Sequence, residues 1–191
     1  MLNLKMIRSF RIYLAGERGY TLIELLVVVV MIGIMTAIVF ANPNVWQSSL
    51  SLDRSAQAMS QKISESRGLA MKGFNETGSC SGINGYGIYF SQASSSQYII
   101  YRNCNADYSY DPAADQQIGS AVQLENNILI YNLKVNGATT TALSIAFEPP
   151  NPEVYMNNSS SATSSVTLSI QGDPGKQKTV EINGRGVINI K

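Results

Sequence analysis

Hydrophobic residues follow three different patterns along this chain of 191 residues, and the first is an unbroken apolar run. Residues 25–41 contain no charged side chain, and the run extends back through Leu22 and Ile23. About twenty apolar residues form a helix long enough to cross the hydrocarbon core of a bilayer. The pattern therefore predicts a transmembrane helix over residues 20–41.

The second pattern has the period of an amphipathic helix. Apolar residues recur at spacings of four, three, four and seven, at Leu52, Ala56, Met59, Ile63 and Ala70. They form one stripe, which we expect to pack on the protein's own sheet; docking onto a partner helix is the alternative. The sequence thus predicts that the helix continues over residues 42–73. Pro43 indicates a kink, and Gly73 indicates the helix end.

From residue 86 the pattern changes to short runs that are typical of strands. These runs are residues 86–90, 97–102, 127–135, 142–147, 165–170, 178–182 and 186–190. The polar segments 91–96, 103–115, 137–141 and 157–165 are expected to be loops. The pair Asn183-Gly184 indicates a tight hairpin between the last two runs. The predicted fold class is α+β, with a long N-terminal helix, membrane-spanning and then amphipathic, packed on an antiparallel β-sheet domain over residues 74–191.

One carboxylate, Glu24, lies at the start of the apolar run. A charge within a membrane helix costs about 2.5 to 3.5 kcal/mol on insertion scales, so its presence suggests a function. A side chain that reaches the headgroups is one alternative, and a secretory signal is another. A signal peptide has small residues after its apolar core, however, whereas Gly19 precedes the core here. Basic residues before the run predict a cytoplasmic N-terminus, namely Lys5, Arg8, Arg11 and Arg18.

Residues 19–26, GYTLIELL, resemble the class III prepilin motif of type IV pilins and of the pseudopilins of type II secretion. The resemblance implies a cytoplasmic leader, residues 1–19, that prepilin peptidase cuts between Gly19 and Tyr20 before methylating the new amine on Tyr20. It also implies that Glu24 pairs with the N-terminal ammonium of a neighbouring subunit during assembly. Tyr20 stands where the family usually has Phe. A start at Met6 instead of Met1 would shorten a leader that is longer than most.

The long helix and the β-rich half together resemble the GspH/FimT family, and most closely FimU-like minor pilins. FEPPNPEVY at residues 147–155 and KTVEINGRGVINI at residues 178–190 are similar to segments of that family. The resemblance implies a minor pilin that primes a type IV pilus or sits at its tip, supporting pilus biogenesis, twitching motility or adhesion. A minor pseudopilin of type II secretion is the alternative.

The same resemblance implies a location and a set of partners. The protein is expected in the bacterial inner membrane, with a periplasmic C-terminal domain, and then in the pilus at the cell surface. The implied partners are prepilin peptidase and other minor and major pilins.

Two cysteines, Cys80 and Cys104, lie in the part predicted to be exported. An oxidising periplasm favours a disulfide between them, with free thiols as the alternative. The chain contains no histidine, and two thiolates alone do not form a tetrahedral zinc site. We therefore expect neither a metal nor a cofactor.

A DNA-binding minor pilin of the FimT type is a further alternative, since some FimT proteins contact phosphates through a Gly-Arg-x-Arg loop. Gly184 and Arg185 match this loop, but Val187 replaces the second arginine. The candidate DNA contacts are Lys176, Lys178, Arg185 and Lys191. Removal of the leader reduces Lys and Arg from 14 to 10 and Asp and Glu from 13 to 12, leaving a net charge of −2. Solvated hairpin charges are therefore the preferred interpretation.

Two further groups of residues suggest binding. Tyrosines at 86, 89, 98, 101, 108 and 110 suggest a surface that stacks on single strands or sugars, although half-buried packing is preferred. Asp107, Asp111 and Asp115 suggest calcium, but neither EF-hand spacing nor a turn glycine accompanies them. The sequence offers no histidine base, activated nucleophile or phosphate-binding glycine loop, so we expect the substrate of an enzyme and not an enzyme.

Overall fold

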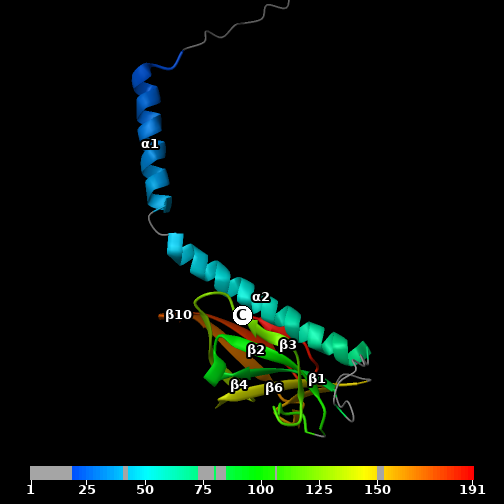
Figure 1. Ribbon diagram of the computed structural model, residues 1–191. Coiled ribbons are helices and arrows are strands. Elements are labelled where there is room, and N and C mark those ends of the chain that lie inside the picture. Colours follow the sequence, from blue (N-terminus) through cyan, green and yellow to red (C-terminus); the bar gives the residue numbers. More distant parts are fainter. Residues whose placement is uncertain (1–18, 41–42, 73–79, 81–84, 106, 150–152) are drawn as a thin grey trace, which may run out of the picture. The chain divides into compact units, whose positions relative to one another are not determined.

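The computed structural model describes residues 19–40, 43–72, 80, 85–105, 107–149 and 153–191, without the side chains of residues 39–40 and 43–46. The chain forms two compact units, Met1–Pro43 and Asn44–Lys191. Two helices precede a C-terminal domain of antiparallel sheets (Figure 1). The predicted α+β fold class is confirmed. The predicted leader, apart from Gly19, lies outside the described residues.

Helix α1, Leu22–Phe40, belongs to the first unit. Its sequence is apolar except for Glu24, Gly33 and Thr36. Every side chain described in α1, from residue 22 to residue 38, is exposed. Within the described part of the chain, no helix has both the length and the hydropathy that crossing a membrane requires.

Helix α2, Pro43–Lys72, belongs to the second unit except for its first residue. Pro43 occupies the first turn, where the missing N–H is not needed for a helical hydrogen bond. The predicted stripe is buried, with exposed fractions of 4% at Leu52 and 0% at Ala56, Met59, Ile63 and Ala70. Its packing in the protein's own core is therefore confirmed. Residue 42 of the predicted kink and the predicted helix end at Gly73 lie outside the described residues.

The β-rich domain contains a six-stranded sheet of order β3-β2-β1-β6-β7-β8 and a five-stranded sheet of order β11-β10-β9-β4-β5. All neighbouring strands pair antiparallel. The first sheet consists of β1 (Gly85–Ser91), β2 (Gln97–Asn103), β3 (Gln116–Gln123), β6 (Ala142–Glu148), β7 (Glu153–Met156) and β8 (Ser159–Ser160). The second consists of β4 (Ile128–Val135), β5 (Ala138–Thr140), β9 (Ser164–Ile170), β10 (Asp173–Ile182) and β11 (Ile188–Ile190).

The inner faces of both sheets and the stripe of α2 share one hydrophobic core. Alternate residues of the central strands point inward, and the largest buried side chains include Tyr86, Phe90 and Phe147. Helix α2 lies beside the β-rich domain (Figure 1), and its buried side chains belong to the core that both sheets share. The Glu125 N–H donates to Ser55 Oγ over 3.3 Å, and Lys178 Nζ lies 3.1 Å from Asp53 Oδ1.

Several segments predicted as loops contain regular structure. Strand β5 lies within the predicted loop 137–141, β8 lies within 157–165, and a 3-10 helix, Gln92–Ser94, lies within 91–96. Strands β3 and β7 were not predicted. Their polar or short sequences lack apolar alternation, so pairing with a neighbouring strand decides their conformation.

The hairpin between β10 and β11 is confirmed, but its connection is not the predicted tight turn at Asn183-Gly184. The connection spans residues 183–187. Asn183 Oδ1 accepts the N–H groups of Arg185 and Val187, both over 3.0 Å. Gly186 has a φ of 75°, a left-handed conformation that glycine adopts at little cost. The side chain of Asn183 therefore organises a five-residue turn.

Candidate processing and assembly site

The predicted scissile bond joins two exposed residues that precede helix α1. Tyr20 is 79% exposed, and apart from its chain neighbours no heavy atom of a described residue lies within 4 Å of the position where Gly19 would carry a Cβ. Both residues lie outside the helix, which begins at Leu22. Among the described residues, neither helical hydrogen bonds nor side chains from other segments cover this bond, so it is open to a peptidase that binds an extended segment.

Thr21 forms the N-terminal cap of α1 and positions Glu24. Its Oγ1 accepts the Glu24 N–H over 3.3 Å, and its carbonyl oxygen accepts the N–H groups of Glu24 and Leu25 over 3.0 and 3.1 Å. The spacing Thr21-x-x-Glu24 matches the capping box, a signal that the sequence analysis missed. A carboxylate in the first turn also interacts favourably with the positive end of the helix dipole. Glu24 therefore has a local role in starting α1.

Beyond Glu24, α1 presents an apolar surface on all sides. Ile23, Met35 and Ile38 are each about 70% exposed. The Thr36 hydroxyl donates to the Ile32 carbonyl of its own helix and also lies 3.2 Å from the Gly33 carbonyl, so it adds little polarity. A contiguous exposed apolar surface of this length marks a site for lipid or protein contact.

The comparisons with known proteins place a motif on this segment. The prokaryotic N-terminal methylation motif matches residues 14–40, a range that contains Gly19, Tyr20, Glu24 and α1. The chain therefore has a type IV pilin-like N-terminus, which implies processing by a prepilin peptidase and assembly with other pilins. No match was found among curated proteins or among solved structures. The finer resemblance to the GspH/FimT family is not confirmed and stays a prediction.

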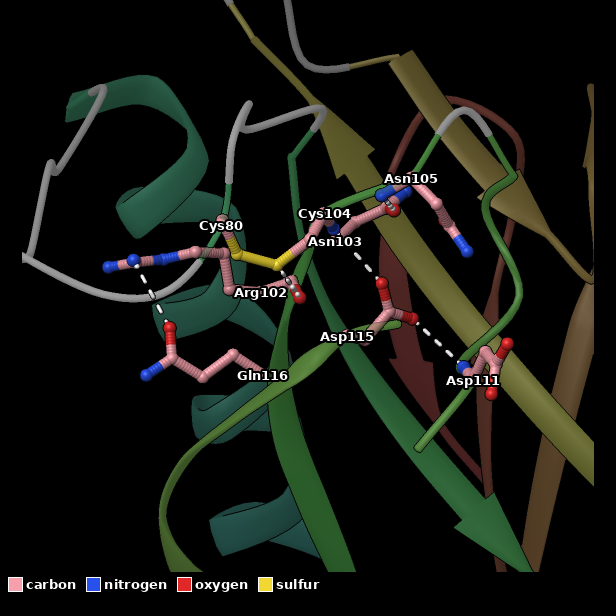
Figure 2. Close-up of a disulfide and its surroundings, with 8 residues drawn as sticks. All are labelled: Cys80, Arg102, Asn103, Cys104, Asn105, Asp111, Asp115 and Gln116. Atoms are coloured by element: carbon pink, nitrogen blue, oxygen red, sulfur yellow. Dashed lines mark hydrogen bonds between the residues drawn. A yellow bond between two sulfur atoms is a disulfide. The ribbon is translucent and has the colours of Figure 1, made fainter. Parts of the chain in front are cut away.

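The predicted disulfide between Cys80 and Cys104 is confirmed (Figure 2). The two Cα atoms lie 5.3 Å apart, and the residues are separated by 24 positions. The bond ties the segment that follows α2 to the end of β2, where the loop of residues 104–115 begins. Figure 2 also shows the Asp115 carboxylate at the other end of this loop.

Asp115 closes the loop by accepting two backbone N–H groups. Its Oδ1 accepts the Cys104 N–H at an N···O distance of 3.0 Å, and its Oδ2 accepts the Asp111 N–H at 2.9 Å. Burial raises the pKa of Asp115, although these two hydrogen bonds act in the opposite direction. Among the described residues no group of three or more His, Cys, Asp or Glu side chains is placed to hold a metal ion. The calcium hypothesis for Asp107, Asp111 and Asp115 gains no support.

Three of the four candidate DNA contacts lie beside carboxylates. Lys178 pairs with Asp53 over 3.1 Å, Lys191 with Glu181 over 2.7 Å, and Lys176 lies 3.9 Å from Asp173. Arg185 is exposed in the β10–β11 turn. Each neighbouring carboxylate reduces the positive potential that phosphates require.

The tyrosines divide between the core and the outer face of the six-stranded sheet. Tyr86 and Tyr98 are buried in the core, and Tyr101 is buried on the outer face beneath Tyr110, so the packing interpretation is confirmed for these three. Tyr101 packs over Gly87 of the neighbouring strand, where a Cβ would lie 2.7 Å from the Tyr101 hydroxyl. Tyr89, Tyr108 and Tyr110 are half-buried instead.

One member of the outer group was missed by the sequence analysis. Tyr155 of β7 stacks on Tyr108, with ring centroids 3.7 Å apart and an interplanar angle of 7°. Burial, together with Glu148 and Glu153, raises the pKa of Tyr155, so its hydroxyl stays protonated at neutral pH. Only the register of β7 against β6 brings Tyr155 to this face, and no sequence pattern predicted β7.

Proposed function

We propose that this protein is a minor type IV pilin. The leader is cut after Gly19, Tyr20 is methylated, and the processed chain enters a type IV pilus, either priming its assembly or standing at its tip. One observation carries this proposal: the methylation motif coincides with a helix that exposes apolar side chains all round and has one carboxylate in its first turn. Such a helix is favourable in lipid, and afterwards among the equivalent helices of a filament.

The role proposed for Glu24 follows from the cost of an unpaired charge. Between packed apolar helices the carboxylate has little water, so it needs a cation close by. Cleavage creates a new ammonium at Tyr20, and assembly brings the ammonium of one subunit to the carboxylate of the next. Loss of either partner leaves the other charge unpaired, which costs about 3 to 5 kcal/mol for a buried pair.

The proposed location is the bacterial inner membrane, with the N-terminus in the cytoplasm and the β-rich domain in the periplasm, followed by the pilus. The Cys80–Cys104 disulfide supports export of this domain because disulfides persist in oxidising compartments. A minor pseudopilin of type II secretion is the second candidate, favoured by the same motif. Recovery of the processed protein only from membranes, and never from sheared surface filaments, would favour it.

The test replaces Glu24 by glutamine in the full chain. Glutamine keeps the capping-box residue type, so Glu24→Gln removes the charge while retaining the start of α1. We expect unchanged processing and membrane content, and more than about tenfold less protein in sheared filaments. Glu65→Gln is the matched control, because Glu65 is exposed and its ion pair among the described residues is with the neighbouring Lys62 of the same helix. Wild-type incorporation of the Glu24→Gln protein would contradict the proposed role.

A further inference from the structure

A pocket of about 310 Å³ lies on the outer face of the six-stranded sheet, and we name it the outer pocket. Its lining includes Tyr89, Ser91, Ser94, Gln97, Ile99 and Tyr110. Four of these residues belong to β1 and β2, where they alternate with buried core residues. Their side chains therefore point away from the core and form the floor of the pocket.

Tyr110 forms a wall of the outer pocket and is held from several directions. Its N–H donates to Ser144 Oγ over 2.9 Å, and its ring centroid lies 4.9 Å from that of Tyr89 and 5.1 Å from that of Tyr101. The loop that carries Tyr110 begins at the disulfide and ends at Asp115, whose carboxylate accepts the Cys104 N–H (Figure 2). The wall is therefore fixed before any ligand arrives, which reduces the entropy lost on binding.

The lining defines the chemistry of a ligand. Among the described residues, the lining has no charged side chain and offers two half-buried tyrosine rings, serine hydroxyls and the amide of Gln97. Gln97 Oε1 accepts from Gln123 Nε2 over 2.6 Å, which orients the Gln97 amide nitrogen as the donor. Such a pocket favours an uncharged molecule that has an apolar face and several hydroxyl groups.

We propose that the outer pocket binds a neutral pyranose sugar. The C–H groups on one face of a pyranose carry partial positive charge and pack on the negative face of an aromatic ring. The ring hydroxyls match the serine and tyrosine hydroxyls and the Gln97 amide. The volume is at the lower end of the range for ligand pockets, so it suits one sugar ring.

The same tyrosines do not make a nucleic-acid site. Bases also stack on tyrosine, but the backbone phosphates need nearby cations. No lysine or arginine is among the described residues that line the outer pocket, and the loop beside it carries Asp107, Asp111 and Asp115. A neutral sugar is therefore favoured over single-stranded DNA.

The test measures binding to the full chain in phospholipid nanodiscs, free of sugar-based detergents. The probes are the methyl glycosides of glucose, galactose, mannose and N-acetylglucosamine. Saturation-transfer difference NMR detects their binding, and titration measures the affinity. Glucuronic acid and a thymidine oligonucleotide serve as charged probes. We expect saturable binding of at least one neutral glycoside. Tyr110→Ala should weaken it at least about tenfold, as expected for loss of a stacking ring.

Two further variants keep the test decisive. Ser94→Trp introduces a large ring at an exposed lining position, so it should abolish binding without disturbing the core even if Tyr110→Ala fails to fold. Tyr131→Ala is the matched control, because Tyr131 is 52% exposed on β4 and lies outside the pocket. Absence of saturable binding to every neutral glycoside, equal loss in Tyr131→Ala, or preference for a charged probe would overturn the proposal.

Discussion

The two helices of this chain show opposite relations between sequence and burial. Met59 of α2 is completely buried, whereas Met31 of α1 is 61% exposed. In α2 a narrow apolar stripe packs in the core, and polar residues such as Gln57 and Gln61 face outward. In α1 the apolar residues cover every side and find no partner among the described residues of their own unit.

The two helices are therefore expected to serve different purposes. The buried side chains of α2 stabilise the β-rich domain, so they contribute to the free energy of unfolding of residues 44–191. Under the proposed function, helix α1 buries its apolar surface against lipid or other subunits, so its residues should determine localisation and assembly. Matched substitutions in the two helices should therefore affect different measurements.

The largest expected change in the free energy of unfolding is the difference between substitutions at Met59 and at Met31. Met59→Ala removes a buried side chain and should reduce the free energy of unfolding by about 2 to 5 kcal/mol. Met31→Ala should leave it unchanged. Urea unfolding of the full chain, followed by circular dichroism of the β-rich domain, compares the two variants. Equal losses would show that α1 also stabilises the domain.

The next largest effect is expected from the disulfide, which should stabilise only the β-rich domain. Replacing both Cys80 and Cys104 by serine should cost about 3 kcal/mol, because the bond closes a loop with a sequence separation of 24. The same urea experiment measures the loss, and wild-type protein treated with a reductant is the control. Unchanged stability of the double variant would mean that Asp115 alone holds the loop.

A pH dependence is expected from the buried tyrosines of the domain. Burial, with a smaller contribution from the negative charge of Glu65, raises the pKa of Tyr98 to about 12. Because this folded-state pKa exceeds the unfolded value of about 10, the stabilisation is complete below pH 10 and is lost as the pH rises towards 12. Between pH 9 and pH 11.5, Tyr98→Phe should therefore lose less stability than the wild type. Tyr131→Phe, at an exposed position, should behave like the wild type.

The smallest effect is expected at the ion pair between α2 and β10. Both side chains are partly exposed, at 38% for Lys178 and 48% for Asp53, so the pair should contribute no more than about 1 kcal/mol. A double-mutant cycle with Lys178→Ala and Asp53→Ala measures the coupling energy. It should decrease further at high salt. A coupling energy that salt leaves unchanged would contradict this surface interpretation.

The sequence predicted the elements whose patterns are strong. The buried stripe of α2, the alternating strands such as β1 and β9, and the disulfide all follow from local spacing or composition. The T-x-x-E signal at Thr21 and Glu24 was also present in the sequence and predicts the cap of α1. The motif at residues 14–40 needs no tertiary contact to be read, since it lies within one continuous segment.

Other features depend on contacts between distant segments. Strand β3 has the polar sequence QQIGSAVQ, and pairing with β2 makes it a strand. The outer pocket requires the loop of residues 104–115 to place Tyr110 beside Tyr89. Lys178 pairs with Asp53 of α2, and Lys191 pairs with Glu181 of the neighbouring strand β10. Local sequence patterns do not predict which of these distant residues come into contact.

The central claim is that residues 14–40 direct processing and assembly, and the N-terminal peptide tests it most directly. Mass spectrometry should be applied to this protein in sheared surface filaments and in the membranes that remain. The account predicts a peptide that begins at Tyr20 and carries one methyl group on its α-amine in the filament fraction. A peptide that retains residues preceding Gly19, in either fraction and in cells with active prepilin peptidase, would contradict it.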